Sequence, residues 1–295
     1  MNLNKRLVAL VAGGTIAAGM ALAFVSKSPA APGNREHRTS LMSAASAISC
    51  LPVKPASAST LSRMPVRPAP SFKVLVVASR AKDHVKMIAA ARPFLEKMAA
   101  DNNFILDFTD DTSRINDANL ANYQVFVMLQ LAPFDMSGSQ QAALQKFAEQ
   151  GKGWVGIHAA GLTGKEFLAP NTPYWDWFEG FMGGVLYSPH PAYQKATLVI
   201  EDRNHPATKN LPARMEVSDE WYEWNKSPRD QVRVLATVDE STYKQNKPMG
   251  NHPIIWTNEH YRRMIYIGVG HDPSLMSDKN YAILLRDAIL WAASK

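Results

Sequence analysis

The sequence predicts an α/β fold: a three-layer sandwich with a mainly parallel sheet and a partly antiparallel C-terminal extension. Two observations lead to this prediction. Between residues 72 and 157, short apolar runs alternate with helical segments, which is the pattern of parallel strands covered by helices on both faces. Beyond residue 190 the apolar runs are shorter and lack long helices between them, which is typical of antiparallel pairing.

The first half of the fold is built from four strands and two helices. The segment 85–100 places Met87, Ala91 and Leu95 on one face, as an amphipathic helix does. Ser137 is a good N-cap for the second helix, and Gly151 ends it. The predicted strands are residues 72–78, 104–108, 124–129 and 154–157, and the predicted helices are residues 85–100 and 137–148.

The second half contains the extension and a closing helix. The clearest strand there is the apolar run 263–269, and residues 280–293 form an amphipathic helix at the end of the chain. The shorter predicted strands are residues 196–201, 214–217, 232–238 and 253–256.

The first seventy residues predict export rather than folded structure. Lys5 and Arg6 precede an uncharged run, and Ala21-Leu22-Ala23 fits a cleavage site, so residues 1–25 are a predicted signal peptide of a periplasmic or otherwise exported protein. An uncleaved N-terminal membrane anchor is the alternative. Residues 26–71 are rich in Pro, Ala and Ser and predict a disordered linker. One globular domain, residues 72–295, remains.

Charge and cysteine usage exclude several function classes. The net charge is +6, but residues 1–71 hold eight Lys or Arg against one Glu, and the remainder holds 24 against 25. The domain itself therefore carries no excess positive charge, which argues against nucleic acid as a partner. The single cysteine, Cys50, lies in the linker. A catalytic thiol in the domain is excluded.

Three histidines follow predicted strands. His84 comes after the first strand, His158 ends the fourth, and His271 follows the strand 263–269. Ligands of open α/β sheets bind beyond the carboxyl ends of the strands, so we expect these imidazoles to gather at one edge. Asp219 and Glu220 could add carboxylates to the same cleft. Such ligands suit Zn²⁺ or a similar divalent metal. The alternative for His158 is a structural role as a buried core histidine whose ring nitrogens are hydrogen-bonded.

Two aromatic clusters allow two interpretations. They are Tyr174-Trp175-Asp-Trp177 and Trp221-Tyr222-Glu-Trp224. Core packing is one interpretation. The other is a wall that stacks on sugar rings, because aromatic faces pair with the apolar faces of pyranoses.

Several motifs together resemble a known family. The sequence is similar to the ThuA-like (trehalose-utilisation) family over nearly all of residues 73–294. The resemblance implies a flavodoxin-like fold of the class I glutamine amidotransferase-like superfamily and a link to sugar and glycoside metabolism. His158 stands where amidotransferases have their nucleophilic cysteine, which excludes amide hydrolysis through a thioester. The motifs are Gly153-Trp-Val-Gly-Ile-His158, Phe181-Met-Gly-Gly184 leading to His190-Pro, Asp202-Arg-Asn-His-Pro-Ala-Thr-Lys-Asn-Leu-Pro212, Asp219-Glu-Trp-Tyr222 and Ile267-Gly-Val-Gly-His-Asp272.

The leading hypothesis is an exported protein that acts on a small-molecule sugar or glycoside with a divalent metal, or a histidine acid/base pair, at the strand ends. Glu220 is the candidate base or ligand, and Asp272 would orient His271. Hydrolysis, elimination and isomerisation all remain open. The candidate catalytic residues are His158, Glu220, His271 and Asp272, the candidate metal ligands are His84, His158, His190 and His271, and the candidate substrate contacts are Trp175, Tyr187, Trp221 and Tyr222.

Two other functions compete with this hypothesis. A non-catalytic carbohydrate-binding module would keep the aromatic wall but show no turnover. A flavin carrier is the third hypothesis, but the loop 79–84 lacks the Ser/Thr/Gly-rich phosphate cradle of such proteins.

Overall fold

The computed structural model describes residue 69 and residues 71–294. The predicted signal peptide and most of the predicted linker lie outside the described residues. Within the described part of the chain, no helix has both the length and the apolar character needed to cross a bilayer.

A nine-stranded sheet forms the centre of the domain, and its first five strands are parallel. Their order, β2-β1-β3-β4-β11, is the 2-1-3-4-5 order of flavodoxin-like folds. The predicted flavodoxin-like arrangement is thereby confirmed. These strands are β1 (Lys73–Ala78), β2 (Ile105–Thr109), β3 (Val125–Leu129), β4 (Gly153–Ile157) and β11 (Met264–Ile267).

The antiparallel extension continues the same sheet beyond β11. Its strands follow in the order β10-β9-β6-β7, and every pairing among them is antiparallel, as is the pairing of β10 with β11. The predicted extension is confirmed. Its strands are β6 (Gln194–Ile200), β7 (Arg214–Asp219), β9 (Arg233–Val238) and β10 (Pro253–Thr257), and a separate two-stranded sheet pairs β5 (Tyr187–Ser188) with β8 (Glu223–Trp224).

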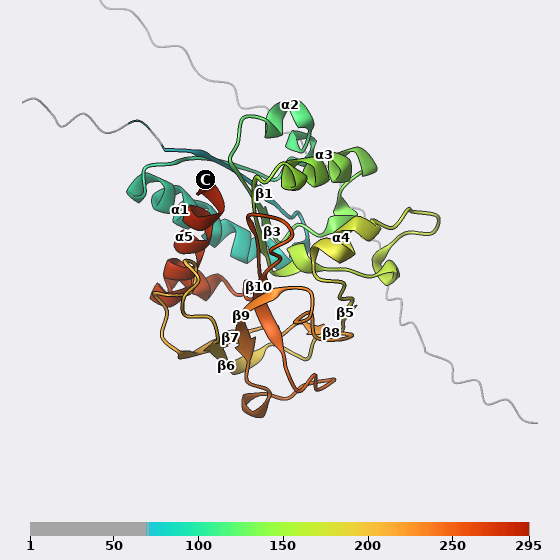
Figure 1. The fold of residues 1–295 in the computed structure, drawn as a ribbon, viewed down its shortest axis with the longest axis vertical. Coiled ribbons are helices and arrows are strands. Elements are labelled where there is room, and N and C mark those ends of the chain that lie inside the picture. Colours follow the sequence, from blue (N-terminus) through green and yellow to red (C-terminus); the bar gives the residue numbers. More distant parts are fainter. Residues whose placement is uncertain (1–68, 70, 295) are drawn as a thin grey trace, which may run out of the picture. The chain divides into compact units, whose positions relative to one another are not determined.

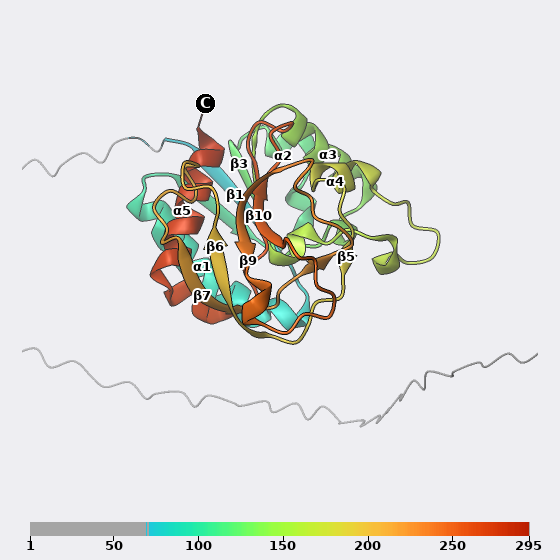
Figure 2. The ribbon, with the colours of Figure 1, turned by 60° about the horizontal axis from the view of Figure 1, so that its bottom comes forward.

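Helices cover both faces of the parallel half. Figures 1 and 2 show α1 and α5 on one side of the strands and α2, α3 and α4 on the other. The long helices are those predicted, whereas the short α2 and α4 were not predicted because each is too short for a helical period to show. The helices are α1 (Val85–Asp101), α2 (Asp117–Leu120), α3 (Gly138–Glu149), α4 (Asp176–Phe181) and α5 (Lys279–Ala293).

Local sequence explains where the two later long helices begin. Ser137 caps α3 in a capping box with Gln140. Asp278 caps α5 by accepting hydrogen bonds from the backbone of Asn280 and Tyr281. Both starts follow from side chains that satisfy the free N–H groups of the first turn.

The core lies against the parallel strands. β1, β3 and β4 are buried almost throughout, as expected for strands covered on both faces. Trp154 of β4 packs edge-on against Phe178 and Phe181 of α4, with ring centroids 6.1 and 5.0 Å apart. The carboxyl ends of β1, β4 and β11 therefore extend from strands that are packed in the core.

Candidate functional site

The structure brings together the three histidines that follow strands. His84 ends the 3-10 helix η1 (Lys82–His84), His158 begins η4 (His158–Gly161) directly after β4, and His271 follows β11. One ligand atom from each imidazole lies within 4.8 Å of the other two, so the described residues contain a three-histidine group that could hold a metal ion. We call these three residues the histidine cluster.

His158 sits in a tight turn with a fixed ring orientation. Its φ of +53° is in the left-handed region that residues other than glycine rarely adopt, and the side chain is fully buried. The ring Nδ1 lies 2.9 Å from the carbonyl oxygen of Gly268. Because a carbonyl oxygen only accepts, Nδ1 must carry a proton, and Nε2 is the ring nitrogen that faces Glu220.

Glu220 lies at the centre of the polar side chains. Its Oε2 atom is 3.3 Å from His158 Nε2, 3.2 Å from His271 Nδ1 and 3.4 Å from His190 Nε2. Burial opposes ionisation of Glu220, but the surrounding imidazoles outweigh it and hold the pKa of this carboxyl well below its usual range. The site therefore carries a carboxylate at neutral pH.

The imidazoles respond to this carboxylate and to burial in different ways. The neighbouring Glu220 carboxylate raises the pKa of His271. Burial, with the imidazoles of His158 and His271, lowers the pKa of His84 to about 4, so His84 is neutral at pH 7. Neutral imidazole is the form that binds metals.

Two nitrogens of the cluster have no hydrogen bond. His84 Nδ1 and His271 Nδ1 are both buried, and neither has a hydrogen-bond partner among the described residues. The contact of His271 with Glu220 is short enough for an ion pair, but it lacks hydrogen-bond geometry. Buried polar atoms are nearly always paired, and a metal ion at this place would supply the missing partner.

His190 is not one of the three clustered histidines, although the sequence predicted it as a metal ligand. Its Nδ1 lies 2.7 Å from its neighbour's carbonyl, Pro191 O, and its Nε2 faces Glu220. Its ring stacks on Tyr222, with centroids 5.3 Å apart. The structure therefore places His190 as a neighbour of the carboxylate.

A cleft of about 480 Å³ opens over the cluster. Of the predicted substrate contacts, Tyr187 and Tyr222 line it. Phe167, which stacks on Phe134 at 5.1 Å, also lines it and was missed, because an isolated aromatic residue in a loop gives no sequence signal. The lining residues are Asp83, His84, Leu162, Phe167, Tyr187, His190, Glu220, Tyr222 and His271.

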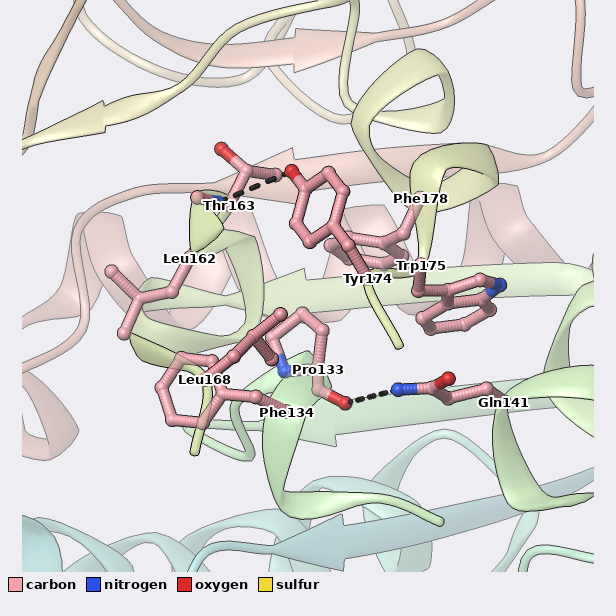
Figure 3. Close-up of a pocket in the computed structure, with 10 residues that line it drawn as sticks. Pro133, Phe134, Gln141, Leu162, Thr163, Leu168, Tyr174, Trp175 and Phe178 are labelled. Atoms are coloured by element: carbon pink, nitrogen blue, oxygen red, sulfur yellow. Dashed lines mark hydrogen bonds between the residues drawn. The ribbon is translucent and has the colours of Figure 1, made fainter. Parts of the chain in front are cut away.

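The other two predicted aromatic contacts lie elsewhere. Trp221 is fully buried, and its indole N–H donates to the carbonyl of Gln194, so it cannot meet a ligand. Trp175 lies in a separate hollow beside Tyr174 and Phe178 (Figure 3). That hollow holds about 20 Å³, roughly the room for one water molecule. For both tryptophans the structure contradicts sugar stacking and supports packing.

Asp272 does not contact the ring of His271 as predicted. Its carboxylate instead accepts a hydrogen bond from Ser274 N at 2.7 Å and caps the 3-10 helix η7 (Pro273–Ser277). Asp219 takes the supporting position. Its fully buried carboxylate accepts hydrogen bonds from the backbone N–H groups of Gly270 and His271. Burial raises the pKa of Asp219, while these donors and His158 oppose the rise.

Comparisons with known proteins agree with this architecture. A putative ThuA-like protein from Bacteroides uniformis is 34% identical with a TM-score of 0.69, covering 79% of this chain and 96% of its own. A putative ThuA-like protein from Parabacteroides merdae is 17% identical with a TM-score of 0.59, covering 76% and 90%.

Sequence comparison gives the family. No curated protein matches this chain. The family model described as "Trehalose utilisation", ThuA, matches residues 73–292, which is nearly the whole described domain. The chain therefore belongs to the ThuA family.

Proposed function

We propose that this protein is an exported enzyme that acts on a sugar or glycoside, with a divalent metal held by His84, His158 and His271. Zinc is the first candidate, since three imidazoles and an open position are a common catalytic zinc site. The observation that carries the proposal is the convergence of three imidazoles within 4.8 Å.

The hydrogen bond from His158 Nδ1 supports the metal site. Nδ1 donates to Gly268 O, which leaves Nε2 on the side of the ring that faces the cluster. Metal-bound histidines commonly donate their second N–H to a backbone carbonyl, as His158 does here.

Glu220 and His190 would then transfer the proton. Glu220 is ionised and open to the cleft, so it is placed to take a proton from a substrate or a water molecule. His190 contacts the same carboxylate oxygen and can pass that proton on. A bound metal would polarise a sugar oxygen or activate water.

Three observations support a sugar as substrate and export as the location. Tyr187 and Phe167, both partly exposed, line the cleft together with the polar cluster, which offers a pyranose ring both an apolar face and hydrogen-bonding groups. The matched family is described by trehalose utilisation. The basic and apolar segment before Ala23 is that of an export signal.

The test is the metal content of the exported protein, purified without chelator. We expect about one metal ion per chain in the wild type and none in the His158→Ala, His271→Ala double variant. His260→Ala, which removes an exposed histidine, should keep the metal. A wild type that is free of metal would overturn the metal site.

A non-catalytic carbohydrate-binding protein is the second candidate, because the aromatic residues of the cleft alone would suffice for it. Turnover of a panel of glycosides distinguishes the two. An enzyme should consume at least one glycoside and lose that activity in the double variant. Sugar binding that is retained in the double variant, with no turnover in either protein, would favour the binding protein.

A further inference from the structure

Asp219 is a buried carboxylate outside the cleft, and the proposed chemistry gives it no direct role. It ends β7, has no exposed surface and does not line the cleft. No Lys or Arg forms an ion pair with it among the described residues, where the one basic side chain in ion-pair range is His158, whose Nδ1 lies 3.8 Å away. Burying a carboxylate costs free energy unless hydrogen bonds compensate for the lost water.

All of these hydrogen bonds come from the backbone of the site. The carboxylate accepts from Gly270 N at 2.8 Å, from His271 N at 3.2 Å and from Glu220 N at 2.7 Å. These donors belong to two segments that are far apart in the sequence, one after β7 and one after β11. One side chain therefore fixes the backbone of both Glu220 and His271.

The segment after β11 is also fixed from its other side. The side-chain amide of Gln130 donates to the carbonyl of Gly270. A Cβ atom on Gly270 would come within 2.6 Å of Ile157 Cγ2 and 3.1 Å of His158 Cβ, so this turn packs directly against His158. A small shift of Gly270 would therefore move His271 relative to His158.

From these contacts we propose that Asp219 is a positioning residue that sets the distances between Glu220, His271 and His158. The inference rests on the proposed function, since its consequence is a preorganised metal site. Residues that hold metal ligands in place affect metal affinity although they do not touch the ion. Asp219 acts through backbone N–H groups rather than through a ligand side chain.

The test compares Asp219→Asn with Glu223→Gln in the full-length exported protein. Glu223 is a matched control, because it is also fully buried and accepts two backbone hydrogen bonds, from Asn246 N and Lys247 N at 2.8 Å each, without contacting the cluster. With Zn²⁺ titrated into metal-free protein, we expect Asp219→Asn to bind about 10- to 100-fold more weakly. Glu223→Gln should bind as the wild type does.

A second readout separates this inference from the metal proposal. The imidazole ¹⁵N spectrum of His271 in metal-free protein should change in Asp219→Asn and not in Glu223→Gln. If the wild type binds no zinc, the metal proposal fails and this spectrum alone decides the role of Asp219. Wild-type zinc affinity in a folded Asp219→Asn, or an unchanged His271 spectrum where no zinc binds, would overturn the inference.

Folding of the variants is checked by circular dichroism. If Asp219→Asn does not fold, Asp219→Ser replaces it, because a hydroxyl can still accept one of the N–H groups and leaves room for water. Failure of both variants to fold, with Glu223→Gln folded, would also overturn the inference, because Asp219 would then be required for the fold as a whole.

Discussion

Glu220 is the residue on which the polar contacts of the site converge. One of its oxygens contacts imidazole nitrogens of His158, His190 and His271, yet it is not among the three clustered metal-binding candidates. These contacts keep it ionised, the form in which a carboxylate can accept a proton, and they also make it a weaker base than a free carboxylate. Its role can therefore be separated experimentally from metal binding.

We predict that Glu220→Gln lowers turnover of a glycoside consumed by the wild type by about 10²- to 10⁴-fold, the usual contribution of a general base. Bound metal should remain near the wild-type level, because the three imidazoles are intact. Steady-state kinetics and metal analysis of the same preparation measure both. Glu216→Gln is the control, since Glu216 is exposed and pairs with Lys195. Equal rates in Glu220→Gln and wild type would contradict the assignment.

His205 gives a prediction about stability and pH. Burial lowers its pKa from 6.5 to about 4, and its ring packs against Trp291 at 4.5 Å. Between pH 6.5 and 4 the unfolded chain binds the proton and the folded protein does not. Neutral His205 therefore adds to the free energy of unfolding in full above pH 6.5. This contribution is lost as the pH falls toward 4, by about 3 kcal/mol in total.

The variant His205→Asn tests this prediction. Asparagine can still accept the hydrogen bond that His205 Nδ1 accepts from Ala207 N, but it does not titrate. Urea denaturation at pH 7 and pH 4.5 measures the free energy of unfolding of both proteins. Between these two pH values the wild type should lose more of this free energy than the variant does. A constant difference would show that His205 is not a source of acid sensitivity.

Strand β4 positions His158 because it is buried and because its glycine leaves room for the ring of Trp154. Gly156 lies in the middle of this strand, and a Cβ atom there would come within 2.5 Å of Trp154 Cζ2 and 2.6 Å of Cζ3. Trp154 in turn packs against α4. The position of His158 at the end of β4 therefore depends on tight packing two residues earlier.

We predict that Gly156→Ala lowers the free energy of unfolding by about 1–3 kcal/mol, as overpacking of a core does. Gly138→Ala is the matched control, since nothing lies within 4 Å of a Cβ at that position of α3. It should remain within about 1 kcal/mol of the wild type. Chemical denaturation of both variants gives the comparison, and equal stabilities would contradict the packing argument.

At the scale of the whole molecule, the histidine cluster joins elements that are distant in the sequence. His84 follows β1, His158 follows β4 and His271 follows β11, at the carboxyl ends of strands that belong to the same parallel half of the sheet. An ion bound by all three would bind only the folded protein, and such binding stabilises the fold by mass action.

Metal removal should therefore lower stability without unfolding the protein. With free zinc at 100 times its Kd, we expect the free energy of unfolding to be about 2.7 kcal/mol higher than in excess chelator. The metal-free protein should stay folded, because the buried strands β1, β3 and β4 do not depend on the ion. Thermal denaturation with and without zinc measures the effect, and identical curves would contradict metal binding by the cluster.

The amino-acid sequence alone predicts the strands of the large sheet, the long helices and the edge at which the site lies, whereas the short strands β5 and β8 were not predicted. Continuous apolar runs such as 124–129 predict buried strands, and the carboxyl ends of parallel strands share one edge, so histidines placed after β1, β4 and β11 had to approach one another. The flavodoxin-like arrangement and the family could be predicted from the motifs.

Which side chains reach the site, and which are buried away from it, follows from contacts between segments that are distant in the sequence. Glu220 meets His158 from 62 residues away, and Gly268 meets it from 110. Trp221 and Tyr222 are neighbours in the sequence and both are buried, yet only Tyr222 borders the cleft, where its ring packs on His190. Local periodicity indicates which residues are apolar, whereas contacts between distant segments depend on how the antiparallel extension joins the parallel half of the sheet.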